Sequence, residues 1–178
     1  MEETMNLDQL ARAIYHTAHI TGEFKLRSGV IADQYFDKYL FEAKPEILQS
    51  IAEHVASLLP EKYDFLAGLE MGGIPVATAL SLHTKTNVLF VRKEAKQYGT
   101  CKLAEGGNVA GKELVIIEDV VTSGGAIMDA VTKLRAQGAL ISKVICVIDR
   151  QAGGRENLEK MGLEFTPLFT KSQLETAL

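Results

Sequence analysis

Apolar residues recur at helical spacing in the first third of the chain and predict two amphipathic helices. The first covers residues 6–19, where Asn6 is a favourable N-cap. Its apolar positions are Leu7, Leu10, Ala11, Ile14 and Ala18. The second begins at Pro45, a residue suited to the first helical turn, and ends before Pro60. Between the two helices, residues 22–37 contain short turns and strand-like pieces.

From residue 65 onward, short apolar runs alternate with helical segments. The runs are rich in β-branched residues, as in strands covered on both faces, and lie at 65–69, 88–92, 114–117 and 144–148. Helices are predicted at 74–83 and 126–137. This alternation predicts an α/β domain with a doubly wound, mainly parallel sheet. We expect one domain over 1–178, in which an N-terminal segment, 1–44, precedes an α/β core, 45–178.

Ligands of such sheets bind beyond the carboxyl ends of the strands. This rule selects four loops in which to look for chemistry, at 70–75, 93–112, 118–125 and 149–155.

Composition narrows the class of protein without naming a function. Of 178 residues, 47% are hydrophobic and 24% are charged, as in an ordinary globular protein. The net charge of −4 gives no global support for binding nucleic acid or an anionic membrane. Cys101 and Cys146 lack the spacing of a metal site or a disulfide framework, and no apolar stretch approaches the ~18 residues of a spanning helix. We therefore expect a cytoplasmic protein with neither nucleic acid nor a membrane as partner.

The segment 114–126 carries the most informative chemistry. An apolar strand leads into Glu118 and Asp119, then into Thr122 and Ser123, then into two glycines that open a helix. Glycines let backbone N–H groups surround an anion at a helix N-terminus, whose partial charge adds about 0.3–1 kcal/mol. A phosphate-binding loop is predicted, with the acidic pair free to bind ribose hydroxyls or a metal ion. The alternative is a surface loop with a solvated acidic pair and a conventional helix cap.

This segment resembles the phosphoribosyl pyrophosphate (PRPP) signature of type I phosphoribosyltransferases. The resemblance implies that Glu118 and Asp119 contact the ribose hydroxyls of PRPP. It also implies that the residues from 122 to 126 hold the 5′-phosphate. The PRPP-binding residues implied after the acidic pair are Val120, Val121, Thr122, Ser123, Gly124, Gly125 and Ala126. The implied fold is that of the family, a doubly wound, mainly parallel sheet with a small N-terminal hood, here within 1–44.

Further motifs resemble those of the orotate-using members of this family and occur in the same order along the chain. They are Phe24–Gly29 with Tyr35-Phe36-Asp37, Gly72-Gly73-Ile74-Pro75, Arg92–Thr100 and Asp149-Arg150. The resemblance implies that backbone amides of Gly72 and Gly73 meet pyrophosphate. It implies orotate contacts from Arg27, Tyr35, Phe36, Thr122 and Arg150. Arg27 and Met71 stand where many relatives have lysine, and Met71 could instead be a core residue.

The physical chemistry of these side chains leaves simpler alternatives open. The guanidinium of Arg150 matches a carboxylate such as that of orotate, but a surface salt bridge would use it equally well. Tyr35 and Phe36 could lie against a flat pyrimidine, or could only pack.

The stretch from 92 to 102 is basic on an acidic protein. Arg92, Lys93, Lys96 and Lys102 stand against Glu94 alone. A solvated basic loop is the simpler interpretation. Its place after a parallel strand favours a mobile lid, 93–112, that closes over pyrophosphate. The resemblance implies PRPP contacts from Arg92, Lys93, Lys96 and Tyr98, and a lid that reaches into the neighbouring subunit of a homodimer.

The reaction implied by the resemblance is the transfer of ribose 5-phosphate from PRPP to orotate, which forms orotidine 5′-monophosphate and pyrophosphate. Lys96 and Asp119 are the expected catalytic residues, and Mg²⁺ is expected to be carried by PRPP and pyrophosphate rather than by a protein site. Two alternatives remain. One is a phosphoribosyltransferase that uses a purine base, and the other is a regulatory protein of the same fold that senses PRPP.

Overall fold

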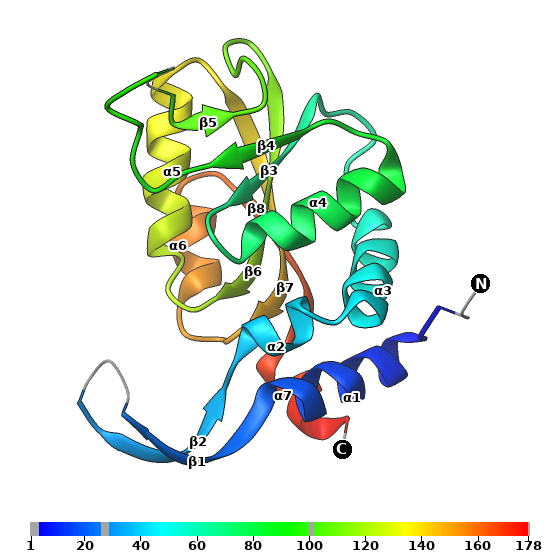
Figure 1. Cartoon of the computed structure of the whole chain (residues 1–178). Coiled ribbons are helices and arrows are strands. Elements are labelled where there is room, and N and C mark those ends of the chain that lie inside the picture. The colour runs from blue at the N-terminus through cyan, green and yellow to red at the C-terminus, as the bar shows by residue number, and fades with distance from the viewer. Residues whose placement is uncertain (1–3, 26–28, 100–101, 178) are drawn as a thin grey trace.

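A central β-sheet organises the molecule (Figure 1). The computed structural model describes residues 4–25, 29–99 and 102–177, and within them this sheet has six strands in the order β5-β4-β3-β6-β7-β8. The strands are β3 (Phe65–Leu69), β4 (Val88–Val91), β5 (Ala104–Glu105), β6 (Glu113–Val121), β7 (Leu140–Asp149) and β8 (Glu164–Thr170). All neighbouring pairs are parallel except β4 with β5.

The strand order changes direction between β3 and β6. From β3 the chain passes through a helix to β4 on one side, and from β6 it passes through a helix to β7 on the other. Such a switch point opens a crevice at the carboxyl ends of the two strands. The fold therefore places the ligand site where the loops after Leu69 and Val121 meet.

Helices cover both faces of the sheet (Figure 1). α3 (Pro45–Ala56) and α4 (Gly73–Thr84) lie on one face, and α5 (Gly125–Ala136) and α6 (Gly154–Lys160) lie on the other. Alternate side chains of β6 point to opposite faces of the sheet. Val115 and Ile117 pack into the core with α3 and α4, while Ile116 packs into the core with α5. Burial of both faces explains why the strands read as continuous apolar runs.

The N-terminal segment forms the hood. α1 (Leu7–Ala18) starts with a capping box between Asn6 and Gln9, as predicted, and packs against α2 (Lys38–Glu42), α3 and α7 (Lys171–Thr176). β1 (His19–Lys25) and β2 (Ile31–Phe36) form an antiparallel hairpin that projects from the body of the molecule (Figure 1). No helix in the described ranges is long and apolar enough to cross a membrane.

The predicted parallel sheet, its main helices and the strand-like pieces within 22–37 are confirmed, but two local predictions are wrong. β6 continues to Val121, so the first part of the predicted loop 118–125 belongs to the sheet. The segment 93–112 is not an uninterrupted loop, because β5 lies within it and Leu103, Ala104 and Val109 are buried.

Candidate functional site

The loop between β6 and α5 forms an open anion cradle. Thr122 and Ser123 are exposed, and Gly124 has a φ of +77°, a conformation that suits glycine and turns the chain into the helix. The loop is held from behind, since Asn157 Nδ2 donates a hydrogen bond to the Ser123 carbonyl at 3.1 Å. A hollow here is lined by Glu118, Val120, Val121 and residues 122–127. Backbone N–H groups at the start of a 12-residue helix thus border a space suited to phosphate.

Gly72 and Gly73 let the loop after β3 come into contact with β6. A Cβ built on Gly72 would lie 1.6 Å from Asp119 Oδ2, and one on Gly73 would lie 2.4 Å from the Ile117 carbonyl oxygen. Any larger side chain would therefore separate the two loops of the switch point. The preceding Met71 is 61% exposed, so its assignment to the core is wrong.

Glu118 and Asp119 are buried, which excludes the solvated acidic pair considered above. Asp119 is completely inaccessible, and its Oδ2 lies 2.5 Å from Lys38 Nζ. The backbone N–H of Asp119 donates to Glu118 Oε1 at 3.1 Å. Glu42, also buried, lies beside Asp119 one turn along α2 from Lys38.

The three carboxyl groups and the ammonium have unequal protonation. Burial and the neighbouring Asp119 raise the pKa of Glu42 to about 9, and they raise the pKa of Glu118 well above its ordinary value. Burial acts against ionisation of Asp119, but the neighbouring Glu118, Glu42 and Lys38 side chains together lower its pKa. Burial likewise disfavours the charged form of Lys38, yet Asp119 raises the pKa of that amine. At neutral pH, therefore, Asp119 is the ionised carboxylate and is paired with the Lys38 ammonium.

A second hollow adjoins the anion cradle and is lined by three of the five residues predicted for the acceptor. Tyr35, Phe36 and Arg150 all line it, and Val120 lines both hollows. The other lining residues are Tyr15, His19, Gln34, Ile148, Lys171, Leu174 and Glu175. The backbone N–H of Arg150 donates to the Val121 carbonyl at 2.8 Å, which holds the loop after β7 against the end of β6. An aromatic wall and a guanidinium thus lie next to the cradle.

Two predicted residues fall outside the described ranges. Arg27, expected to contact orotate, and Cys101, in the expected lid, both lie there.

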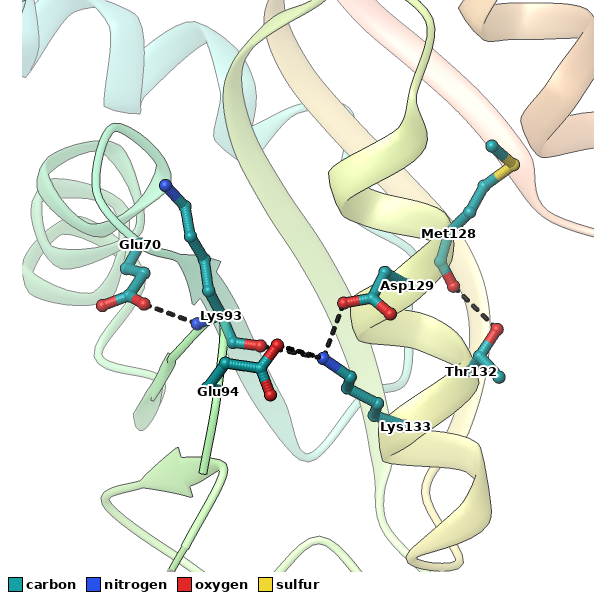
Figure 2. A network of polar contacts seen from close by, with 7 residues as sticks. All are labelled: Glu70, Lys93, Glu94, Met128, Asp129, Thr132 and Lys133. Carbon is teal, nitrogen blue, oxygen red and sulfur yellow. Dashed lines mark hydrogen bonds and ion pairs between the residues drawn. The ribbon is translucent and has the colours of Figure 1, made fainter. Parts of the chain in front are cut away.

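The start of the basic segment is tied to the loop after β3 and to α5 (Figure 2). The backbone N–H of Lys93 donates to Glu70 Oε1 at 2.5 Å. Lys133 Nζ donates to the Lys93 carbonyl at 2.9 Å and forms ion pairs with Glu94 and Asp129 at 3.1 and 2.8 Å. The base of the expected lid is thereby fixed to two elements of the switch point.

Further along, the cations of this segment lie apart from both hollows. Lys96 Nζ forms an ion pair with Glu105 Oε1 at 2.7 Å, and Tyr98 is 74% exposed. Of the described residues in 92–99, none lines the cradle or the aromatic hollow. Of the described residues, the structure thus brings Glu118 and 122–126 to the cradle and Tyr35, Phe36 and Arg150 to the adjoining hollow. It brings none of Arg92, Lys93, Lys96 and Tyr98 to either.

Sequence reasoning missed Lys38, Glu42 and Lys133. Lys38 and Glu42 are four residues apart and bracket the apolar run Tyr39-Leu40-Phe41. That spacing would place both on one helix face, a signal that was available in the sequence. For Lys133 the sequence offers only an ordinary pair with Asp129 on an exposed helix surface.

Comparison with known proteins defines the class of this site. Residues 39–170 match the family model of the phosphoribosyl transferase domain, a range that includes both glycine loops, the basic segment and Arg150. The chain is 51% identical to the orotate phosphoribosyltransferase of a Nocardioides species, over 97% of each chain, and 42% identical to that of Halobacterium salinarum, over 86% of this chain and 87% of the relative.

Solved structures agree with this class. The orotate phosphoribosyltransferase of Mycobacterium tuberculosis in complex with PRPP superposes with a TM-score of 0.81 at 25% identity, covering 95% of this chain and 98% of that one. Another structure of that enzyme, in complex with Fe(III) dicitrate, gives a TM-score of 0.84 at 28% identity, covering 94% and 98%. The chain belongs to the orotate phosphoribosyltransferase family.

Proposed function

We propose that the chain transfers ribose 5-phosphate from PRPP to orotate and forms orotidine 5′-monophosphate and pyrophosphate, a step in the de novo synthesis of UMP. One observation carries the proposal. The anion cradle at the start of α5 adjoins a hollow with an aromatic wall and a guanidinium, and Val120 lines both. A phosphorylated sugar in the cradle would therefore present its anomeric carbon to a flat, anionic base in the neighbouring hollow. The curated relatives described above carry this activity in their names.

The donor lies across the switch point. Backbone N–H groups of 122–126 and the hydroxyls of Thr122 and Ser123 bind its 5′-phosphate. Glu118, which lines the cradle, contacts a ribose hydroxyl, and the Asp119 carboxylate accepts a hydrogen bond from another. Gly72 and Gly73 present backbone amides to pyrophosphate, as their contact with the end of β6 favours.

The acceptor lies in the second hollow. Tyr35 and Phe36 contact the pyrimidine ring, and Arg150 pairs with its carboxylate. Thr122, in the cradle and two residues after Val120, contacts both substrates. Arg27, outside the described ranges, completes the acceptor contacts that the family resemblance implies.

The leaving group is stabilised by Arg92, Lys93, Lys96 and Tyr98. The bond from the anomeric carbon to pyrophosphate breaks as a bond to an orotate nitrogen forms, and that nitrogen loses its proton to solvent. Negative charge then gathers on pyrophosphate. These side chains lie apart from both hollows of their own chain, which supports a homodimer in which the segment 93–112 serves the site of the neighbouring subunit.

The magnesium ion implied for the reaction would be held by the donor rather than by the protein. Within the described residues, no group of three or more histidine, cysteine, aspartate or glutamate side chains is suited to hold a metal ion. Asp119 is already paired with Lys38, so the residues present fit a metal carried by the diphosphate better than a resident one. Mg²⁺ bound to pyrophosphate oxygens supplies charge stabilisation to the leaving group.

A cytoplasmic location is also part of this proposal. It is supported by Cys146, which is buried as a free thiol.

The test is pyrophosphate release with PRPP, Mg²⁺ and one base at a time: orotate, uracil, adenine or hypoxanthine. Release with orotate alone supports the proposal. Release only with a purine indicates a purine-type phosphoribosyltransferase, and no release with any base, together with PRPP binding, indicates a regulatory protein that senses PRPP. Gel filtration with light scattering tests the homodimer separately.

A further inference from the structure

Asp119 occupies an unusual position for an ionised side chain. It lies in β6 beyond the last register pair with β3, Gly68 with Ile117, so it stands where β6 extends past its neighbour at the switch point. It is 0% exposed and touches the loop of Gly72. An isolated buried carboxylate would take up a proton, so its charge has to be maintained by the groups around it.

The groups that face Asp119 come from two elements. Glu118, on the same strand, and Glu42, from α2, are carboxyl groups whose negative forms would oppose its ionisation. Lys38, also from α2, brings a positive charge to 2.5 Å from Oδ2. Lys38 is thus the ion-pair partner of Asp119 among the described residues.

Lys38 also connects Asp119 with the acceptor side of the site. It follows β2, which carries Tyr35 and Phe36, and Asp37 Oδ1 caps α2 by accepting a hydrogen bond from the Tyr39 N–H at 3.1 Å. The ion pair therefore joins the hood to the end of β6. The side chain of Lys38 is 32% exposed, so the ion pair links a buried carboxylate with an ammonium that stays in contact with solvent.

We propose that Lys38 is a positioning residue that keeps the Asp119 carboxylate charged and directed toward the loop of Gly72 while it fastens the hood over the strand ends. The inference rests on the proposed phosphoribosyl transfer, in which Asp119 acts on the sugar. Lys38 acts through Asp119, so its loss should affect turnover more than binding of the acceptor.

Steady-state kinetics of Lys38→Met and Lys38→Arg test this role. Lys38→Met keeps the length of the aliphatic stem and removes the charge, and we expect kcat to fall by about 10- to 100-fold, the scale of a small misplacement of a catalytic group. The KM for orotate should change by less than about threefold, since the hollow with Arg150 is intact. Lys38→Arg keeps the charge and should recover most of kcat.

Lys44→Met is the matched control, because Lys44 is exposed and lies just beyond the C-terminus of α2. Its kcat should equal that of the wild type. Should Lys38→Met fail to fold, Lys38→Gln, whose amide can still donate to Asp119, replaces it with the same readouts.

Three results would overturn the inference. They are a kcat for Lys38→Met equal to that of Lys44→Met, a higher kcat that marks Lys38 as a mere shield over Asp119, or equal losses for Lys38→Met and Lys38→Arg that follow their unfolding midpoints. A wild-type protein that releases no pyrophosphate with orotate would instead defeat the proposed function itself.

Discussion

Two charged regions of the molecule serve the same expected reaction but are built differently. At the end of β6, Asp119 and Lys38 form an ion pair in which the carboxylate is fully buried. At the start of the basic segment, Lys133 holds Glu94 through a pair in which the glutamate side chain is 84% exposed. Removal of one partner from a buried pair costs about 3–5 kcal/mol, whereas an exposed pair contributes about 0–1 kcal/mol.

The difference in burial between the two ion pairs indicates that one region is rigid and that the other can rearrange. The end of β6 is fixed before any ligand arrives, because strand pairing, close glycine contacts and burial all determine its geometry. The segment 92–99 is held by a few polar contacts that other contacts can replace at small cost. A rigid end of β6 beside a weakly held cationic segment suits a reaction in which the leaving group has to be covered and then released.

The largest effect is expected at the rigid end of β6, from the substitution Gly72→Ala in the loop that packs against it. The new Cβ would overlap Asp119 Oδ2 and would push the two loops of the switch point apart. We expect kcat/KM for PRPP to fall by about 10²-fold or more, measured by pyrophosphate release. Gly162→Ala is the control, since a Cβ on Gly162 would meet no atom within 4 Å. This variant should lose stability through its φ of +71° but keep its turnover. Equal kinetics for both variants would contradict a role for the close contact.

The next effect tests the basic segment through Lys96→Ala. If Lys96 acts on pyrophosphate mainly in the transition state, kcat should fall by about 10²-fold. Lys102→Ala, on the same segment, should stay near the wild type. Unchanged turnover in Lys96→Ala would reject its catalytic role, whatever happens to the ion pair with Glu105.

A smaller effect is expected in stability, from Glu42→Gln. The pKa of Glu42 is about 9 in the folded protein against an ordinary value of 4.5. Between these two pH values, the folded state therefore keeps a proton that the unfolded state releases. The contribution of Glu42 to the free energy of unfolding is fully present below about pH 4.5. It is lost as pH rises toward about 9, by at most about 1.4 kcal/mol per pH unit.

Glutamine carries no such proton, so the variant should gain stability relative to the wild type as pH rises. We expect a relative gain of about 1–3 kcal/mol between about pH 5.5 and about pH 8, measured by denaturant unfolding. Parallel stability curves for the two proteins would show that Glu42 is already ionised in the folded state.

The smallest effect is expected from Lys133→Ala on the exposed network of Figure 2. The unfolding free energy should change by less than about 1 kcal/mol, because each ion pair is solvated. A double-mutant cycle with Glu94→Ala should give a coupling of about 0.5 kcal/mol or less. A coupling as large as that of a buried pair would remove the distinction between the two regions.

The sequence was sufficient to predict the parallel sheet and the glycine-rich turn at the start of α5. Strands buried on both faces leave continuous apolar runs, and the glycines of 124–125 mark the start of α5. The sequence did not predict that β6 continues through Glu118 and Asp119, because two adjacent acids normally end a strand. Their burial depends on Lys38 and Glu42, which arrive from a helix far away in the chain. Such long-range compensation has no local signature.

One residue imposes a constraint on how this site can vary. Val120 forms a wall of both the cradle and the aromatic hollow, as described above. A bulkier side chain at that position would narrow both compartments at once. Redesign of the protein toward a larger base would therefore have to proceed from the hood side, where space can be made without disturbing the sugar phosphate.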